Sequence, residues 1–150
     1  ETDDELSYEE NGILTKYMPL YQRNNDFSGW IEIEGTRIDY PVMQNTQTNA
    51  YYLHRNFNRE ESNPGIPFLD FQCTLNPKSD NMIVYSHNMK NGEMFHDLLK
   101  YKDISFYKEH SEIKFDTIYE IGRYEIFVTV AKIHNTITTI SFAAYARAKY

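Results

Sequence analysis

The chain has 150 residues, of which 41% are hydrophobic and 25% are charged, and this composition suits one globular domain with a buried core. Its formal net charge of −7 argues against nucleic acids and anionic membrane surfaces as partners, because like charges repel. The single cysteine, Cys73, excludes an internal disulfide, and the sequence has no run of about 18 apolar residues that could span a membrane.

The first part of the chain predicts one helix followed by two strands. Apolar residues at helical spacing predict a helix over residues 8–22, which we expect to end or kink just before Pro19. Residues 30–34 alternate between apolar and charged side chains, as a half-buried antiparallel strand does. Gly35 marks a turn, and residues 38–42 predict the returning strand.

The middle of the chain predicts a buried strand that carries a histidine at its end. Residues 51–54 suit a short helical or irregular segment, and residues 66–71 suit a strand. Residues 82–85 are an apolar run of strand formers, after which the polar residues 86–88 end the strand. His87 is thereby placed at a strand end, where it could transfer a proton or pair with an ion. A structural or surface histidine is the alternative that this pattern leaves open.

The last third predicts a helix, a strand and a hairpin. Residues 93–101 have an amphipathic helical pattern, and Ser105 could cap a further short turn. Residues 113–115 suit a strand. Residues 117–121 and 124–132 suit the two strands of a hairpin that turns at Gly122-Arg123.

A series of motifs runs in a fixed order from Asn25 to about Lys132. They are Asp26-Phe27-Ser28-Gly29-Trp30-Ile31-Glu32-Ile33, Gly35-Thr36-Arg37-Ile38-Asp39-Tyr40-Pro41-Val42, Asn49-Ala50-Tyr51-Tyr52-Leu53-His54-Arg55-Asn56-Phe57, Pro67-Phe68-Leu69-Asp70-Phe71, Tyr85-Ser86-His87-Asn88-Met89, Gly92-Glu93-Met94-Phe95 and Asp97-Leu98. Together these motifs resemble the sortase family, most closely the class B sortases, over roughly two-thirds of the chain. The family usually has glycine where Ser86 stands.

The resemblance implies a mostly β fold, a sortase-like β-barrel of antiparallel strands with peripheral helices and an N-terminal helix first. We therefore expect an acidic segment and helix over residues 1–24, and a barrel domain, incomplete at its C-terminus, over residues 25–150. Sortases of this kind carry an N-terminal membrane anchor, so we expect one upstream of Glu1 and a location on the extracellular face of the membrane. The alanine-rich residues 143–150 do not resemble the family and could form a short helix.

The resemblance also implies a cysteine transpeptidase. Its thiolate attacks a threonine carbonyl in the C-terminal sorting signal of a secreted protein, and an amine of a peptidoglycan precursor or a pilin then resolves the thioester. The family assigns His87 as the proton donor for the leaving amine. No cofactor, metal or nucleic acid is implied. The same resemblance places Asn49, Leu53 and Tyr85 at the substrate groove, although core packing is an equal alternative for Leu53 and Tyr85.

The cysteine and arginine of the family follow on two later strands, the cysteine in a Thr-Leu-x-Thr-Cys-like motif that this chain lacks. Cys73 precedes His87, so we interpret it as a bystander thiol, and neither Arg123 nor Arg147 matches the catalytic arginine. Either the later strands belong to a longer polypeptide, or the chain stops near Tyr150 and is inactive alone. A non-catalytic sorting-peptide-binding module and a structural fragment without activity are the alternatives. The remaining histidines have no metal-ligand spacing: His54, His96, His110 and His134.

Overall fold

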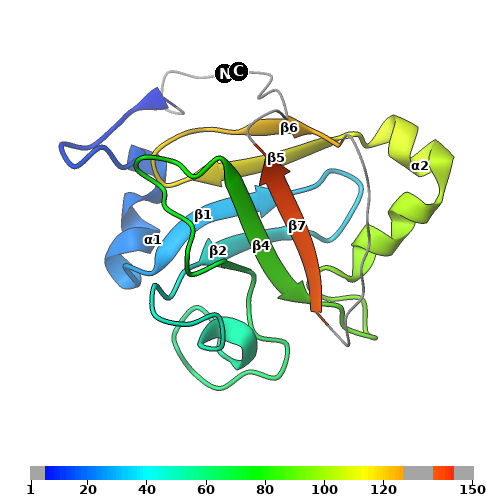
Figure 1. Cartoon of the computed structure of the whole chain (residues 1–150), viewed down its shortest axis with the longest axis horizontal. Helices are drawn as coiled ribbons and strands as arrows, with labels where there is room; N and C mark the ends of the chain where they lie inside the picture. Colours follow the sequence, from blue (N-terminus) through cyan, green and yellow to red (C-terminus); the bar gives the residue numbers. More distant parts are fainter. Residues whose placement is uncertain (1–5, 127–136, 144–150) are drawn as a thin grey trace.

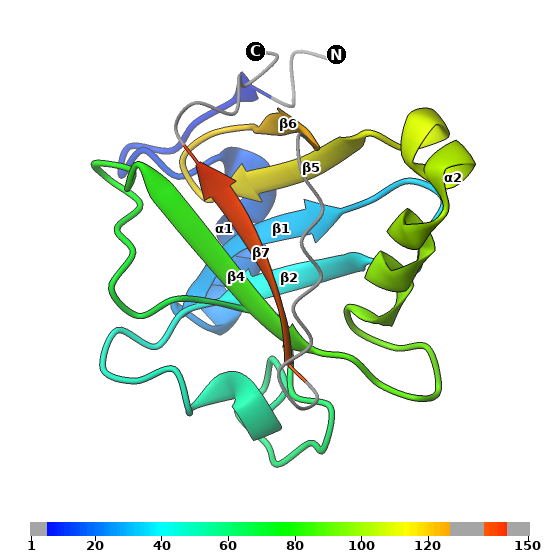
Figure 2. The same cartoon turned by 45° about the vertical axis from the view of Figure 1, so that its right-hand side comes forward.

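The computed structural model describes residues 6–126 and 137–143, which form one curled sheet of seven strands with the order β6-β5-β1-β2-β3-β4-β7. Figures 1 and 2 show that the sheet bends into roughly half a barrel. All neighbouring strands are antiparallel except β2 and β3, which are parallel. The mostly β prediction is therefore confirmed. The strands are Phe27–Glu32 (β1), Asp39–Met43 (β2), Phe68–Leu69 (β3), Asn81–His87 (β4), Glu112–Thr117 (β5), Arg123–Glu125 (β6) and Ile137–Ala143 (β7).

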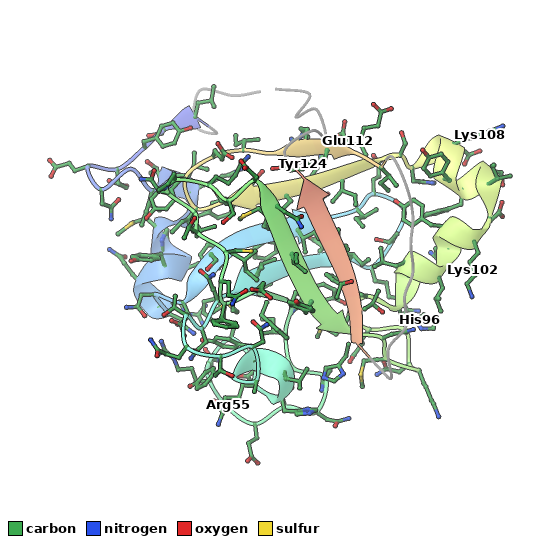
Figure 3. The ribbon with its side chains drawn as sticks, in the orientation of Figure 1. Arg55, His96, Lys102, Lys108, Glu112 and Tyr124 are labelled. Carbon is green, nitrogen blue, oxygen red and sulfur yellow. The ribbon has the colours of Figure 1, made fainter. Side chains whose placement is uncertain are left out.

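Short helices lie around the sheet. In Figure 1, α1 stands on one side of the sheet and α2 on the other. Figure 3 shows Lys102 and Lys108 on the side that carries α2, and both side chains are exposed. None of the helices in the described part of the chain is long and apolar enough to cross a membrane. The helices are the 3-10 helices Thr15–Tyr17 (η2), Tyr52–His54 (η3) and His96–Lys102 (η4), and the α-helices Met18–Arg23 (α1) and Ile104–Glu109 (α2).

The N-terminal helix begins later than the sequence predicts. Residues 8–14 do not form a helix, because Tyr8 and Leu14 pair in an antiparallel bridge. Pro19 does not interrupt the helix but is the second residue of α1. At this position proline sacrifices no intrahelical hydrogen bond, and its fixed φ suits the first turn.

Strands β1 and β2 form the predicted hairpin, with Trp30 opposite Pro41 and Ile31 opposite Tyr40. Pro41 lies inside β2. Strand β3 pairs with β2 only at Met43, so Pro41 meets no strand on its other side. A proline without a backbone donor is tolerated at such an edge position.

Strand β4 is confirmed over the predicted residues. Met82 and Val84 pack with Ile31 and Phe115 in the main core. The curled sheet encloses this core. A second apolar cluster joins the N-terminal segment to the opposite face of the sheet around Phe27. Burial of these large side chains on both faces stabilises the fold by the hydrophobic effect, at about 25 cal/mol per Å² of apolar surface.

The second half departs from the sequence prediction in two helices. The helix predicted over residues 93–101 is a 3-10 helix over His96–Lys102. The cap of α2 is Asp103, not Ser105, because the Asp103 carboxylate accepts a hydrogen bond of 2.9 Å from the Ser105 amide. Aspartate is a strong N-cap because it accepts from an otherwise unpaired helical N–H group.

The hairpin is not formed by the strands predicted over residues 117–121 and 124–132. β5 pairs with β6 so that Lys114 lies opposite Arg123, and residues 118–122 form the turn. The Asp116 carboxylate closes this turn by accepting a hydrogen bond of 3.1 Å from the Gly122 amide. The predicted strand residues 127–132 and the predicted helix residues 144–150 lie outside the described residues.

Candidate functional site

Strand β4 carries the candidate catalytic histidine at its last residue. Because side chains alternate along a strand, Val84 and Ser86 point toward the enclosed core, and Tyr85 and His87 point to the opposite face. His87 is only 7% exposed. Its carbonyl accepts a hydrogen bond of 2.9 Å from the Phe95 amide, which fixes the strand end to the loop before η4. The structure therefore fixes His87 at the end of β4, the strand end at which the sequence predicts it.

The imidazole of His87 is oriented by the segment that includes η3. Its Nε2 lies 2.8 Å from the carbonyl oxygen of Leu53, which can only accept, so Nε2 donates. The rings of His54 and His87 lie with their centroids 5.1 Å apart and are tilted by 35°. The His54 Nδ1 in turn lies 3.1 Å from the Asn63 carbonyl. Two successive residues of one helix thus contact the histidine, one through its backbone and one through its ring.

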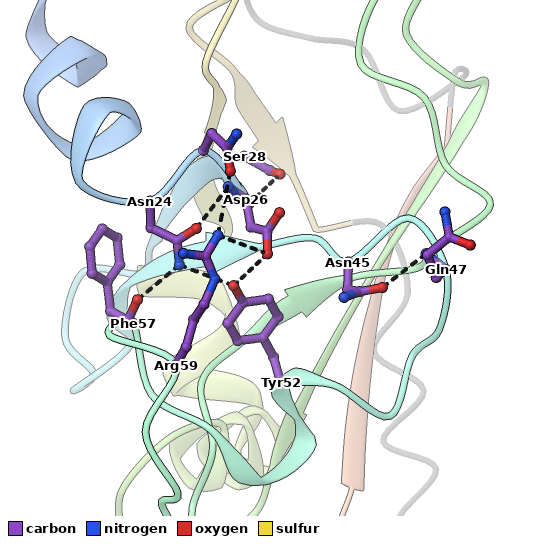
Figure 4. Close-up of polar contacts among 9 residues, drawn as sticks. Asn24, Asp26, Ser28, Asn45, Gln47, Tyr52, Phe57 and Arg59 are labelled. Atoms are coloured by element: carbon purple, nitrogen blue, oxygen red, sulfur yellow. Dashed lines mark hydrogen bonds and ion pairs between the residues drawn. The ribbon is translucent and has the colours of Figure 1, made fainter.

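Helix η3 is itself anchored to the start of β1 by a buried tyrosine (Figure 4). The Tyr52 hydroxyl donates to the Asp26 carboxylate at 2.7 Å and accepts from the Asn24 amide at 3.0 Å. Asn24 also donates to the Phe57 carbonyl at 2.9 Å, and Arg59 lies 3.7 Å from Asp26. Burial, followed by the hydrogen bond to Asp26, raises the pKa of Tyr52 to about 12, so its hydroxyl stays protonated.

Two of the predicted groove residues meet on one carboxylate. The Asp70 Oδ2 accepts hydrogen bonds from the Tyr85 hydroxyl at 2.9 Å and from the Asn49 amide at 3.1 Å. The Tyr85 ring also stacks on Phe68, with centroids 5.4 Å apart. Burial, followed by the hydrogen bond to Asp70, raises the pKa of Tyr85 to about 12.

The predicted site residues therefore form two contact groups. Leu53 contacts His87, and Asn49 joins Tyr85 through Asp70. Contact with a substrate remains a prediction for Asn49, Leu53 and Tyr85.

Cys73 lies at the wrong end of β4 to serve His87. Its sulfur is 3.6 Å from the carbonyl oxygen of Asn81, the first residue of the strand, whereas His87 is the last. The six intervening steps, at about 3.3 Å each, separate the two ends by roughly 20 Å. Partial burial raises the pKa of the Cys73 thiol, and the charge of Asp70 also raises it. The geometry agrees with a bystander thiol rather than a nucleophile.

Arg123 is also remote from the histidine. It lies on β6, which four strands separate from β4 in the sheet order, and its Nε is 3.9 Å from the Glu112 carboxylate. Figure 3 shows Glu112 at the top of the view and His96 near the lower end of β4. Arg147 and His134 lie outside the described residues. Among residues 6–126 and 137–143, no group of three or more His, Cys, Asp or Glu side chains could hold a metal ion.

Comparisons with known proteins agree on one family. Sortase B of Listeria monocytogenes serovar 1/2a is 35% identical over 137 residues, which cover 89% of this chain and 55% of the relative. The solved sortase B from B. anthracis in complex with AAEK1 has a TM-score of 0.72 and 33% identity, covering 79% of this chain and 56% of that chain. By sequence and by fold, this chain is class B sortase-like.

A solved Staphylococcus aureus sortase B–substrate complex matches this sortase-like chain with a TM-score of 0.71 and 35% identity, covering 75% of this chain and 52% of that chain. The sortase-like chain spans about half the length of the curated relatives it matches. No family model matches it.

Sequence reasoning missed two residues that contact the predicted site residues of this sortase-like chain. Asp70 follows the short strand β3, and its side chain contacts Asn49 and Tyr85, which lie 21 and 15 residues away in sequence. The one available signal was its place in the motif Pro67-Phe68-Leu69-Asp70-Phe71. His54 directly follows Leu53 and meets His87 only after the chain folds.

Proposed function

We propose that this chain acts as part of a sortase B-like cysteine transpeptidase. The enzyme would cleave a C-terminal sorting signal of secreted proteins and join the new carboxyl end to a cell-wall or pilin amine. The observation that carries the proposal is the position of His87, buried at the end of β4 within the motif Tyr85-Ser86-His87-Asn88-Met89. Sequence identity of 35% to sortase B supports it.

His87 would act on the leaving group. A cysteine thiolate adds to the threonine carbonyl, the carbon–nitrogen bond then breaks, and a protonated His87 gives its proton to the departing amine. The incoming amine next attacks the thioester and gives a proton to the now neutral His87, a new amide bond forms, the carbon–sulfur bond breaks, and the thiolate is released. The Leu53 carbonyl supports this role because it fixes the ring orientation through Nε2 before any substrate binds.

The partners are proposed from the relatives. One solved sortase B is a substrate complex, and another is complexed with triglycine. We therefore propose a sorting-signal peptide and an amine as the two substrates of this chain, at the extracellular face of the membrane. The groove would be lined by Asn49, Leu53 and Tyr85.

A non-catalytic sorting-peptide-binding module is the second candidate. The observation that favours it is the distance of roughly 20 Å between the ends of β4, which separates His87 from Cys73, the only cysteine in these 150 residues. Such a module would retain the groove and bind the peptide without forming a thioester.

One experiment distinguishes the two candidates. The protein, expressed as its host makes it, is incubated with fluorogenic sorting-signal peptides, and both cleavage and peptide binding are measured. The transpeptidase predicts cleavage that thiol alkylation and His87→Ala abolish. The binding module predicts a peptide affinity that neither treatment changes, with no cleavage. Absence of both cleavage and binding across candidate signals contradicts both functions.

A further inference from the structure

We propose that Asp70 is a positioning residue that fixes the wall of the peptide groove by holding Asn49 and Tyr85 together. This inference rests on the proposed function, because it assigns the groove to a sorting-signal peptide. Neither the sequence pattern nor the resemblance gives Asp70 a role. The structure makes it the common acceptor of two side chains from separate segments.

The Asp70 carboxylate uses both of its oxygens. Oδ2 accepts from the Tyr85 hydroxyl at 2.9 Å and from the Asn49 amide at 3.1 Å, and Oδ1 accepts from the Gln72 backbone amide at 2.9 Å. An ionised carboxylate can accept all three hydrogen bonds, whereas an asparagine side chain has only one acceptor oxygen. The carboxylate is therefore the side chain that this arrangement requires.

The backbone of Asp70 is fixed as well. Its amide donates to the Ile83 carbonyl of β4 at 2.8 Å. Its carbonyl accepts a hydrogen bond of 3.0 Å from the side-chain amide of the buried Gln44, which also donates to the Cys73 carbonyl at 2.8 Å. Two hydrogen bonds therefore fix the backbone of Asp70 independently of its side chain. A residue that supports a preorganised site requires this rigidity.

Asn49 is held at both ends of its amide. Its nitrogen donates to Asp70, and its oxygen accepts a hydrogen bond of 2.8 Å from the Phe71 amide. Tyr85 likewise directs its hydroxyl to Asp70 and stacks its ring on Phe68. These two residues would therefore contribute to the groove mainly through their fixed shape.

The contact between Asp70 and Asn49 also affects His87, although only indirectly. Asn49 precedes η3 by three residues, and η3 brings Leu53 to His87. Loss of the Asp70 contacts frees the start of this segment, while Tyr52 still anchors η3 to Asp26. We therefore expect peptide binding to weaken more than the proton-transfer step.

The test measures the binding of a fluorescent sorting-signal peptide by anisotropy for the wild-type protein, Asp70→Asn and the control Asp80→Asn. Asp80 is exposed, so the control makes the same change in charge away from the groove. We expect Kd to rise about tenfold in Asp70→Asn, the scale of one or two lost oriented hydrogen bonds, and to stay unchanged in the control. Loss of folded protein alone would also raise the apparent midpoint, so the folded fraction of each variant is measured by circular dichroism and Kd is expressed per folded protein. A structural role alone leaves this corrected Kd unchanged.

The outcomes separate this inference from the proposed function. Wild-type protein that binds no candidate peptide overturns both. Wild-type binding with an unchanged midpoint in Asp70→Asn overturns the role of Asp70 alone. If Asp70→Asn does not fold, Tyr85→Phe keeps the ring and removes only the hydroxyl. We expect a rise of about threefold in Kd for this variant, and an unchanged Kd overturns the inference.

Discussion

Cys73 and His87 lie at opposite ends of strand β4. The cysteine sulfur is beside the first residue of the strand, and the imidazole belongs to the last. Because the strand is regular and paired along its whole length with β7, this separation is built into the sheet. It removes Cys73 from the reaction that the sortase-like relatives suggest, and it leaves His87 as the residue to test first.

Replacement of Cys73 by serine is expected to leave function intact. Serine can still donate a hydrogen bond to the Asn81 carbonyl. The Cys73 thiol is too far from His87 to exchange a proton or form an ion pair with it. Peptide cleavage or binding should stay within about twofold of wild type, and stability within about 1 kcal/mol. Loss of activity in this variant, with folding verified by circular dichroism, would make Cys73 the nucleophile and refute the assignment.

Replacement of Tyr52 by phenylalanine should destabilise the protein by about 1–3 kcal/mol, because it removes the buried hydrogen bonds that the hydroxyl makes with the Asp26 carboxylate and the Asn24 amide. The side chain is only 1% exposed, so little water can replace the lost hydroxyl. Urea unfolding measures the change. Tyr21→Phe is the matched control, since the Tyr21 hydroxyl has no hydrogen bond among the described residues, and equal losses in both variants would contradict the prediction.

The Asp70 carboxylate should make stability depend on pH. Burial alone would raise its pKa, but hydrogen bonds from the Gln72 amide, Asn49 and Tyr85 outweigh burial and hold the pKa below its ordinary value of 3.8. A pKa lowered in the folded state gives stability that is present above the unfolded value and is lost as the pH falls through the folded value. The difference in unfolding free energy between wild type and Asp70→Asn should therefore shrink below about pH 4.

Urea unfolding between about pH 3 and pH 7 measures this difference, with Asp80→Asn as the reference. A difference that stays constant over the whole range would mean that Asp70 stabilises the fold without its charge.

Removal of the His54 ring should disturb His87 without unfolding the protein. The two rings lie 5.1 Å apart, and His54 is exposed on its other side, so His54→Ala removes contact with the imidazole at little cost in packing. We expect peptide cleavage to fall severalfold, with the peptide KM near that of wild type. A change in KM alone would place His54 in peptide binding instead.

Strand β4 was predictable because its signal is local. An apolar run of strand formers, bounded by polar residues, needs no distant partner to be recognised. The contact between Leu53 and His87 was not predictable, since it joins residues 34 apart in sequence. The helix predicted over residues 8–22 failed for a related reason: apolar spacing does not reveal the bridge between Tyr8 and Leu14.

The wrong hairpin has the same origin. Gly122-Arg123 suggested a turn, but the Asp116 side chain closes that turn by binding the Gly122 amide. The paired strands β5 and β6 therefore lie on either side of a turn over residues 118–122. Side-chain hydrogen bonds of this kind compete with the backbone preferences from which a turn is predicted.

The most direct test of the account is intact-mass and peptide-mapping mass spectrometry of the protein, as its host makes it, after incubation with a sorting-signal peptide. The account predicts a thioester adduct on a cysteine other than Cys73, and turnover of that adduct by an added amine in wild type but not in His87→Ala. An adduct on Cys73 would contradict the central claim that His87 serves a sortase-like reaction from the end of β4. Turnover of the adduct in His87→Ala at the wild-type rate would contradict it as well.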